Sequence, residues 1–129
     1  MNGRLLLDTN AVIGILENDE DAGKLLESSQ ELVLPIIALG ELYYGARASS
    51  KSERNQERVR EFSRRHSVLD CDEETAEIYG TLRDQLRKKG RPIPDNDIWI
   101  AAIATQHGLT IVTRDKHFSQ IEDLPTEAW

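Results

Sequence analysis

The sequence LLLDTN occupies residues 5–10 and contains the signals that end one predicted element and begin the next. Its three leucines form a short apolar run of the length typical of a buried strand. Asp8 follows the run directly, and the triplet Asp8-Thr9-Asn10 can cap the start of a helix. The stretch therefore predicts a strand that leads into a helix through a carboxylate.

The rest of the chain repeats this alternation. Further strands are predicted at 32–34, 68–69 and 110–113, and helices over 11–28, 36–48, 50–65, 73–89 (with Asp72 as N-cap) and 96–107. The last of these helices is apolar on most sides, which is typical of a buried helix. Alternating strands and helices predict an α/β fold, a three-layer sandwich with a central parallel sheet flanked by helices. No repeat or linker divides the chain, so we expect a single domain over residues 1–129.

The net charge argues at first against a nucleic-acid partner. Sixteen basic and 23 acidic residues leave a net charge of −7, whereas phosphate contacts need basic surface. The charge is unevenly distributed, however, because residues 47–66 and 82–91 each carry a net charge of +4. Both blocks lie in predicted helices, where solvated faces with i,i+4 ion pairs are the simpler interpretation.

Composition also bears on location. No apolar run has the roughly 18 residues that a membrane helix needs, and the leucines of residues 5–7 are too few for a signal peptide. The single cysteine, Cys71, permits no intramolecular disulfide and no cysteine-based zinc site. We therefore expect a cytoplasmic protein without membrane contact.

Four acidic residues stand where such a fold can bring them together. Asp8 follows the first predicted strand and Asp115 the last, and parallel strands place their carboxyl ends at one edge of the sheet, where ligands bind. Glu41 lies about a turn and a half into the helix after the second strand. The helix before Asp97 runs away from this edge, but the segment 90–97 can return as far if it is extended. The sequence permits Asp97 at the edge and does not require it.

Carboxylates gathered in one place favour a cation. Two unit charges about 5 Å apart repel by roughly 3 kcal/mol at an effective dielectric constant of 20. Oxygen ligands suit Mg²⁺ or Mn²⁺ better than zinc. Simpler interpretations exist for single residues: Asp8 as a helix cap, Asp97 as a cap or a partner of the helix dipole, and Asp115 as a turn residue. Glu41 is harder to explain in this way, because it lies beside apolar residues of a half-buried helix.

Four segments carry a family resemblance: LLLDTN at 5–10, ELYYG at 41–45, DNDIWIAA at 95–102 and IVTRD at 111–115. In this order and spacing the chain resembles the PIN domain, and specifically the VapC-type toxins of toxin–antitoxin pairs. The resemblance covers essentially the whole chain. It implies a parallel sheet between helices and a metal-dependent endoribonuclease that hydrolyses RNA phosphodiesters with an activated water.

By position, the resemblance implies that the catalytic, metal-binding residues are Asp8, Glu41, Asp97 and Asp115, with Mg²⁺ or Mn²⁺ as the ion. Supporting positions are Thr9, Asn10, Asp95 and Thr113. The implied partners are RNA, a VapB-type antitoxin that blocks the site, and a second copy of the chain in a homodimer. DNA would be contacted only indirectly, through the antitoxin.

Basic, aromatic and histidine side chains outside the four acidic positions could also contact RNA, a second copy of the chain or a metal. Arg47, Lys51, Arg54 and Arg58 follow the Glu41 segment and could line an RNA path, although a solvated helix face is the favoured interpretation. Trp99 is expected in the core or at a dimer contact. The histidines are scattered along the sequence, and we expect none of them to be a ligand: His66, His107 and His117.

Two alternative functions remain. A receiver-type phosphoacceptor domain has similar length, acidity and α/β architecture, and Asp70 near the end of the third strand stands where an acceptor could lie. It leaves Glu41 and the segment around Asp97 without a role. A PIN fold retained only for binding RNA or protein is opposed by the complete set of four acids.

Overall fold

A five-stranded parallel sheet forms the centre of the molecule. The computed structural model describes residues 3–28 and 30–129, and the strands run in the order β3-β2-β1-β4-β5. Their bounds are β1 Arg4–Leu7, β2 Glu31–Pro35, β3 Ser67–Leu69, β4 Thr110–Val112 and β5 Thr126–Glu127. The middle strand β1 pairs with both β2 and β4, with Leu6 opposite Val33 on one side and Ile111 on the other.

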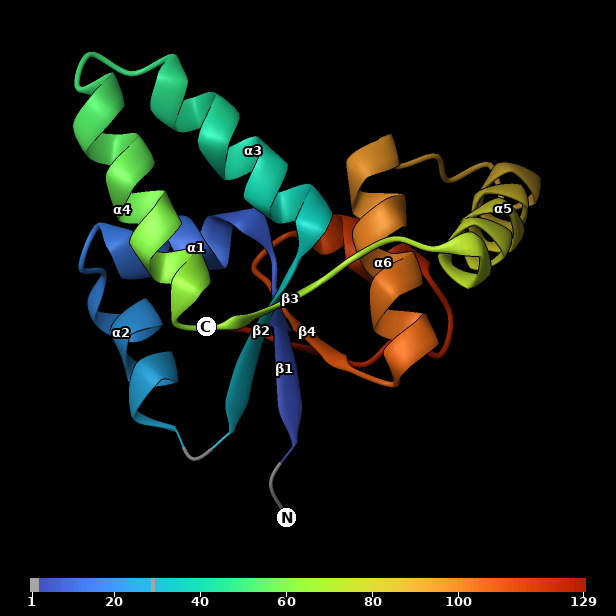
Figure 1. Ribbon diagram of the computed structural model, residues 1–129. Helices are drawn as coiled ribbons and strands as arrows, with labels where there is room; N and C mark the ends of the chain where they lie inside the picture. The colour runs from blue at the N-terminus through green and yellow to red at the C-terminus, as the bar shows by residue number, and fades with distance from the viewer. Residues whose placement is uncertain (1–2, 29) are drawn as a thin grey trace.

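Helices cover both faces of this sheet, as the alternating pattern predicts (Figure 1). Four of them lie on one side: α1 Thr9–Leu16, α2 Glu20–Glu27, α3 Ile36–Arg47 and α4 Ser52–Arg64. On the other side lie α5 Glu73–Lys88, α6 Asp95–His107 and the short 3₁₀ helix η1 Lys116–Gln120. The predicted three-layer α/β architecture is confirmed.

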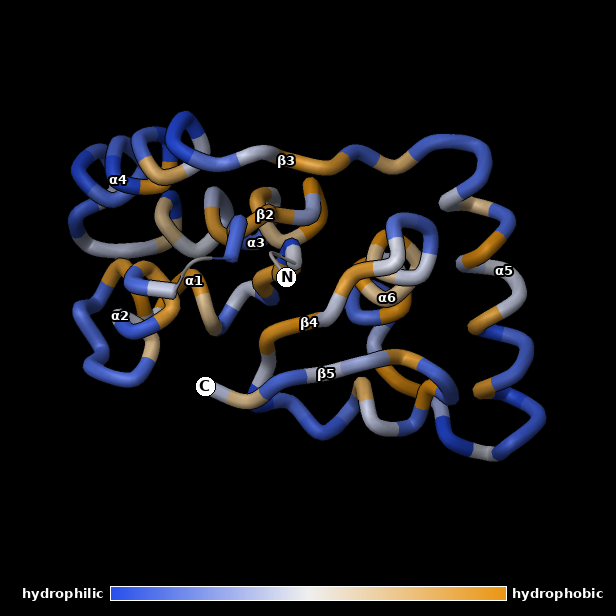
Figure 2. The backbone as a smooth tube through the Cα atoms, turned by 90° about the horizontal axis from the view of Figure 1, so that it is seen from below, coloured by the Kyte–Doolittle hydropathy of each residue, from blue (hydrophilic) through white to orange (hydrophobic). Residues whose placement is uncertain are grey.

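The alternation of side chains along β1 divides the interior into two apolar cores. Leu6 faces one side, where it packs with the buried residues of α5 and α6. Leu5 and Leu7 face the other side and pack with α1, α3 and α4. Figure 2 shows that the hydrophobic segments of α5 face α6, which lies between α5 and the strands. Successive residues of a strand point to opposite faces, so a run of three leucines serves both cores.

The first predicted helix, 11–28, is wrong in one respect, because the structure has two helices there. The chain breaks after α1 at Asn18, whose φ of +60° is left-handed. Asp19 then caps α2 by accepting a hydrogen bond of 3.0 Å from the backbone N–H of Ala22. Asparagine tolerates the left-handed conformation and aspartate is a favourable N-cap, so these two residues end one helix and begin the next.

The bounds of the later helices agree more closely with those predicted from the sequence. Asp72 is the N-cap of α5 and forms a capping box with Thr75, as predicted from its position. The helix α6 is nearly all buried on its middle turns and ends at Gly108, whose φ is +65°. Two elements, η1 and β5, have no counterpart in the predicted set. Within residues 3–28 and 30–129, no helix is long and apolar enough to cross a membrane.

Candidate active site at the carboxyl edge of the sheet

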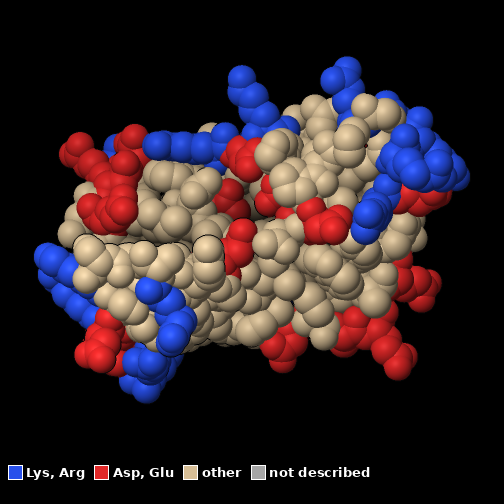
Figure 3. Space-filling view, turned by 90° about the horizontal axis from the view of Figure 1, so that it is seen from above, with Lys and Arg blue, Asp and Glu red and all other residues tan. Residues whose placement is uncertain are grey.

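The four acids singled out in the sequence line a single pocket. Its volume is about 500 Å³, and it opens at the edge where β1, β2 and β4 end. Figure 3 shows acidic side chains gathered in the hollow of this face, with basic side chains around its margin. The lining residues are Asp8, Thr9, Asn10, Glu41, Pro94, Asp95, Asn96, Asp97, Ile100, Asp115 and His117.

Asp8 is the most deeply buried of the four acids, with 5% of its surface exposed. One carboxylate oxygen accepts a hydrogen bond of 2.8 Å from the backbone N–H of Ala11, which caps α1. The other accepts a hydrogen bond from the hydroxyl of Thr113 at the end of β4. Burial raises the pKa of Asp8, partly opposed by these hydrogen bonds and reinforced by the nearby charges of Asp115 and Asp97. The helix-cap interpretation is therefore confirmed, and the same carboxylate also borders the pocket.

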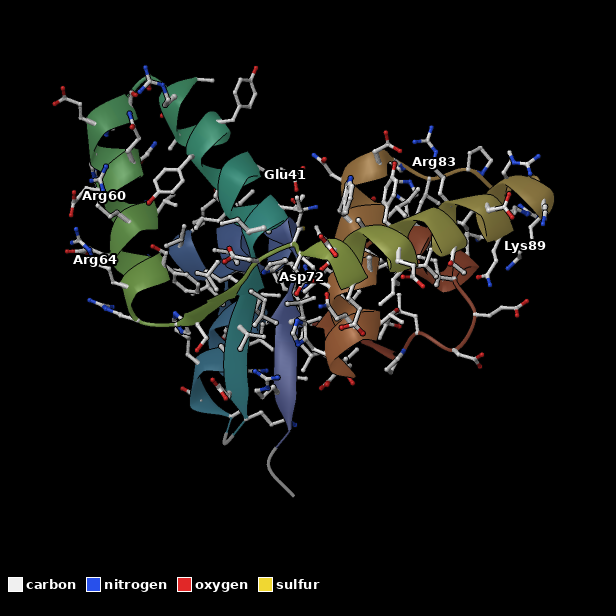
Figure 4. The ribbon with its side chains drawn as sticks, turned by 45° about the vertical axis from the view of Figure 1, so that its right-hand side comes forward. Glu41, Arg60, Arg64, Asp72, Arg83 and Lys89 are labelled. Carbon is white, nitrogen blue, oxygen red and sulfur yellow. The ribbon has the colours of Figure 1, made fainter. Side chains whose placement is uncertain are left out.

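Glu41 reaches the pocket from the middle of α3. Figure 4 shows it on the side of α3 that faces α6. The hydroxyl of Thr9 donates a hydrogen bond of 2.6 Å to Oε1 of Glu41, which joins α1 to α3 and orients the carboxylate. The supporting position of Thr9 thus acquires a physical explanation, because it holds a neighbouring acid in place.

Asp97 lies at the carboxyl edge of the sheet, a position that the sequence permitted but did not require. The segment after α5 returns to the carboxyl edge, and α6 begins there with Pro94 as N-cap and Asp97 in its first turn. Burial raises the pKa of Asp97, His117 lowers it by a hydrogen bond, and the charges of Asp115 and Glu41 raise it. Because Pro94 is the N-cap, the interpretation of Asp97 as a helix cap is wrong. Its place in the first turn agrees with the alternative that an acid there interacts favourably with the helix dipole.

Asp115 and Thr113 form a tight turn after β4. The backbone N–H of Asp115 donates a hydrogen bond of 2.9 Å to the hydroxyl oxygen of Thr113. The side chain of Asp115 in turn accepts a hydrogen bond of 2.9 Å from the backbone N–H of His117. Asp115 is thereby the N-cap of η1. Thr113 is buried and contacts both Asp8 and Asp115, so this supporting residue ties two of the acids together.

His117 was not expected at the site, and the structure places it there. Its Nδ1 lies 2.9 Å from Oδ2 of Asp97 and 3.0 Å from Oδ1 of Asp115. The hydrogen bond with Asp97 and the negative charges of both acids raise the pKa of His117. The sequence signal that could have found it is its position two residues after Asp115, where a turn brings the side chain back toward the carboxylate.

Asp95 is turned away from the other acids, although it borders the pocket. Its Oδ1 accepts a hydrogen bond of 3.1 Å from the hydroxyl of Tyr79 and lies 3.5 Å from Arg83 on α5. Trp99 stacks on the Tyr79 ring, with 4.0 Å between centroids and 12° between planes. Trp99 is partly buried, and its stacking partner comes from within this chain.

The basic residues proposed for an RNA path lie beyond the pocket. Arg47, Lys51 and Arg54 are exposed near the turn between α3 and α4, at the upper left of Figure 1. Arg58 is half-buried, and its guanidinium donates a hydrogen bond to the backbone carbonyl of Leu16. Its contact in this structure therefore ties α4 to α1.

The arrangement suits a hard divalent cation. Four carboxylates converge from four separate segments, and none of the described lining residues is a lysine or arginine that could neutralise them. Asp97, Asp115 and His117 each offer a ligand atom, and these atoms lie within 4.8 Å of one another. Carboxylates with waters complete the kind of coordination shell that Mg²⁺ and Mn²⁺ take in nucleic-acid enzymes.

Comparison with known proteins shows the family to which this chain belongs. Residues 5–124 match the PIN domain family. Ribonuclease VapC2 of Haemophilus influenzae is 35% identical over 98% of both chains. The tRNA(fMet)-specific endonuclease VapC of Shigella flexneri is 33% identical, again over 98% of both. The solved structure of VapBC2 from Rickettsia felis, bound to a DNA fragment from its promoter, superimposes with a TM-score of 0.90 at 30% identity and covers 98% of both chains.

These likenesses extend over nearly the whole chain, at identities above those at which only the fold is shared. They exclude the receiver-type alternative, and Asp70, its candidate acceptor, does not line the acidic pocket. The chain belongs to the PIN domain family and, within it, to the VapC toxin ribonucleases of VapBC toxin–antitoxin systems.

Proposed function

We propose that this chain is a Mg²⁺- or Mn²⁺-dependent endoribonuclease whose metal is held by Asp8, Glu41, Asp97 and Asp115. The observation that carries the proposal is the convergence of these four carboxylates, from the N-cap of α1, from α3, from α6 and from the turn after β4, on one pocket. The relatives named as ribonucleases support RNA as the substrate.

The donor set of this chain fits such an ion. The buried carboxylate of Asp8 and that of Asp97 have raised pKa values, mainly because burial penalises their charge. A divalent cation supplies the compensating charge and restores the ionised form. The metal, when bound, would supply Lewis acidity toward the phosphate and an activated water.

The surrounding residues keep the four acids in place. Thr113 donates to Asp8 and accepts from the backbone of Asp115, while Thr9 donates to Glu41. Hydroxyl groups can orient carboxylates in this way without adding charge to the pocket. The role of these residues is thus to position the carboxylates and to satisfy the oxygen lone pairs that do not face the pocket.

The same chemistry supports the proposed partners. A pocket lined by carboxylates attracts a cationic side chain, so a basic residue of a VapB-type antitoxin can enter and block it. The relative from Rickettsia felis is a VapBC complex on promoter DNA, and we propose that this chain meets DNA only through its antitoxin. We further propose a homodimer acting in the cytoplasm, where its RNA substrate is found.

The relative from Shigella flexneri makes tRNA the first substrate to test. We expect the purified chain to cleave tRNA(fMet) when Mg²⁺ or Mn²⁺ is present and to be inactive in EDTA. The variants Asp8→Asn and Asp97→Asn should each slow cleavage by about 100-fold or more while their circular dichroism spectra remain those of a folded protein. A matched control is Asp70→Asn, which removes an exposed aspartate outside the pocket.

The outcomes separate the parts of the proposal. Cleavage in EDTA, or full activity in both pocket variants, contradicts the metal-dependent mechanism. Metal-dependent cleavage of another RNA, with tRNA(fMet) intact, retains the mechanism and replaces the substrate.

A further inference from the structure

His117 stands out among the residues of the pocket because its side chain contacts two of the four acids. The two separations, 2.9 Å to Asp97 and 3.0 Å to Asp115, join a single nitrogen atom, Nδ1, to one oxygen of each carboxylate. The three residues come from α6 and from the turn that starts η1. Of the three histidines in the chain, His117 is the one that lines this pocket.

The turn that carries His117 is fixed on both sides. Before it, Asp115 accepts the backbone N–H of His117 at 2.9 Å. After it, Phe118 is 1% exposed and packs in the same core as α6. The anchored turn therefore fixes the backbone of His117 beside the two carboxylates, and the half-exposed imidazole reaches both of them from there.

The spacing of these atoms also matches a coordination shell. Metal–ligand distances of about 2.1 Å in octahedral geometry put adjacent ligand atoms about 3.0 Å apart. The Nδ1 of His117 already stands at that separation from an oxygen of Asp97 and an oxygen of Asp115. A neutral imidazole nitrogen is a common metal ligand, so a bond to a metal could replace the contacts of Nδ1 with the two carboxylates.

We infer that His117 is a nitrogen ligand of the divalent metal, beside Asp97 and Asp115; this inference rests on the proposed metal-dependent function. The resulting ligand set combines carboxylate oxygens with one imidazole. Imidazole binds Mn²⁺ in preference to Mg²⁺, whereas oxygen ligands alone discriminate less. His117 therefore biases the site toward Mn²⁺.

The decisive measurement is electron spin echo envelope modulation on the untagged protein loaded with Mn²⁺. A directly bound imidazole produces a ¹⁴N modulation on the Mn²⁺ signal, and labelling with ¹⁵N-histidine should change that modulation. We expect the modulation in the unaltered chain and its loss in His117→Gln. The matched control is His107→Gln, an exposed histidine ten residues after Asp97 and thus about 15 Å along α6.

Metal affinity gives a second readout. Titration of free Mn²⁺ by its six-line spectrum should show affinity about 10-fold weaker in His117→Gln, with a smaller decrease for Mg²⁺ measured by competition. The control variant should bind both ions as the unaltered chain does. A thermal melt of each variant without metal checks that the difference does not come from unfolding.

The failures are distinguishable. Bound Mn²⁺ without nitrogen modulation in the unaltered chain overturns the inference and leaves the proposed nuclease function standing. Modulation that survives in His117→Gln also overturns it, because another nitrogen is then the ligand. An unaltered chain that binds no Mn²⁺ or Mg²⁺ at all contradicts the proposed metal-dependent function itself.

Discussion

The hydroxyl of Thr113 donates a hydrogen bond to the carboxylate of Asp8, although the two residues are 105 positions apart in the chain. Both follow neighbouring parallel strands, β1 and β4, and both are buried. The backbone N–H of Asp8 also donates to the carbonyl of Val112 at 3.3 Å, which extends the pairing of the strands up to the site. Thr113 also accepts a hydrogen bond from the backbone N–H of Asp115, so this one residue links the first and the last acid of the pocket.

Removing this hydroxyl should weaken the fold and the site together. Thr113→Val keeps the shape of the side chain but leaves a buried oxygen of Asp8 and the N–H of Asp115 without their partner. We expect a decrease of about 1–3 kcal/mol in the free energy of unfolding, measured with urea at neutral pH. The control Thr81→Val removes an exposed hydroxyl on α5 and should change stability by less than about 0.5 kcal/mol. Equal effects of the two variants would contradict the buried hydrogen bond.

The pH dependence of stability should reveal the burial of Asp8. Its pKa is raised in the folded state, so the folded protein binds this proton more tightly than the unfolded chain does. The contribution of Asp8 to stability is therefore most favourable below its unfolded-state pKa and is lost as the pH rises through the folded-state pKa. At neutral pH without metal, the ionised carboxylate destabilises the fold.

It follows that Asp8→Asn should be more stable than the unaltered chain in EDTA at neutral pH, by about 0.5–2 kcal/mol. The asparagine oxygen can still accept from the N–H of Ala11 and cap α1. The gain should shrink as the pH falls through the raised pKa of Asp8, because the carboxyl of the unaltered chain then becomes protonated. Adding Mn²⁺ should raise the melting temperature of the unaltered chain only. A variant that is less stable than the unaltered chain at neutral pH in EDTA would show that burial is not the dominant effect.

The close approach of Trp129 to α1 predicts that a larger side chain at Gly14 would not fit. A Cβ on Gly14 would lie 2.9 Å from the ring of Trp129 and 3.0 Å from the Cβ of Ala22. The indole is also held by the guanidinium of Arg114, 3.7 Å above the ring centroid. We expect Gly14→Ala to destabilise the protein by about 1–3 kcal/mol, because this ring must move.

The matched control for this variant is Gly23→Ala on α2. A Cβ there has no atom within 4 Å, so the substitution should stabilise the helix by about 0.5–1 kcal/mol. Urea denaturation of the two variants side by side gives the comparison. Opposite signs are expected, and a neutral Gly14→Ala would mean that Trp129 does not pack against α1.

The basic residues beyond the pocket can be tested by the salt dependence of RNA binding. Replacing both Arg47 and Arg54 by alanine should weaken binding of single-stranded RNA. The slope of log K against log salt should fall by about 0.7 for each phosphate that the variant no longer neutralises. Arg58 is left intact because its guanidinium contacts the Leu16 carbonyl. The control is Arg4→Ala, because Arg4 lies at the start of β1, at the end of the strand away from the pocket. It should leave the slope unchanged. An unchanged slope would return Arg47 and Arg54 to the interpretation of a solvated helix face.

Much of the fold follows from local patterns in the sequence. The apolar runs of β1, β2 and β4 and the apolar positions of α3, α5 and α6 recur with the periods of strand and helix, so their type could be predicted. The break between α1 and α2 was missed because apolar residues recur at helical positions beyond the polar run 17–21, with Leu16 before it and Leu25 and Leu26 after it. The strand β5 was missed because two residues carry no pattern, and Thr126 becomes a strand residue only by pairing with Ile111.

The sequence by itself determined the parallel sheet and the positions of Asp8, Glu41 and Asp115, because each lies within a few residues of a recognisable strand end. Only the tertiary structure decided that Asp97 returns to this edge and that His117 stands between Asp97 and Asp115. The physical reason is that the first set depends on local geometry and the common edge of parallel strands. The second depends on the course of an irregular segment and on one anchored turn, and no periodicity in the sequence encodes either of them.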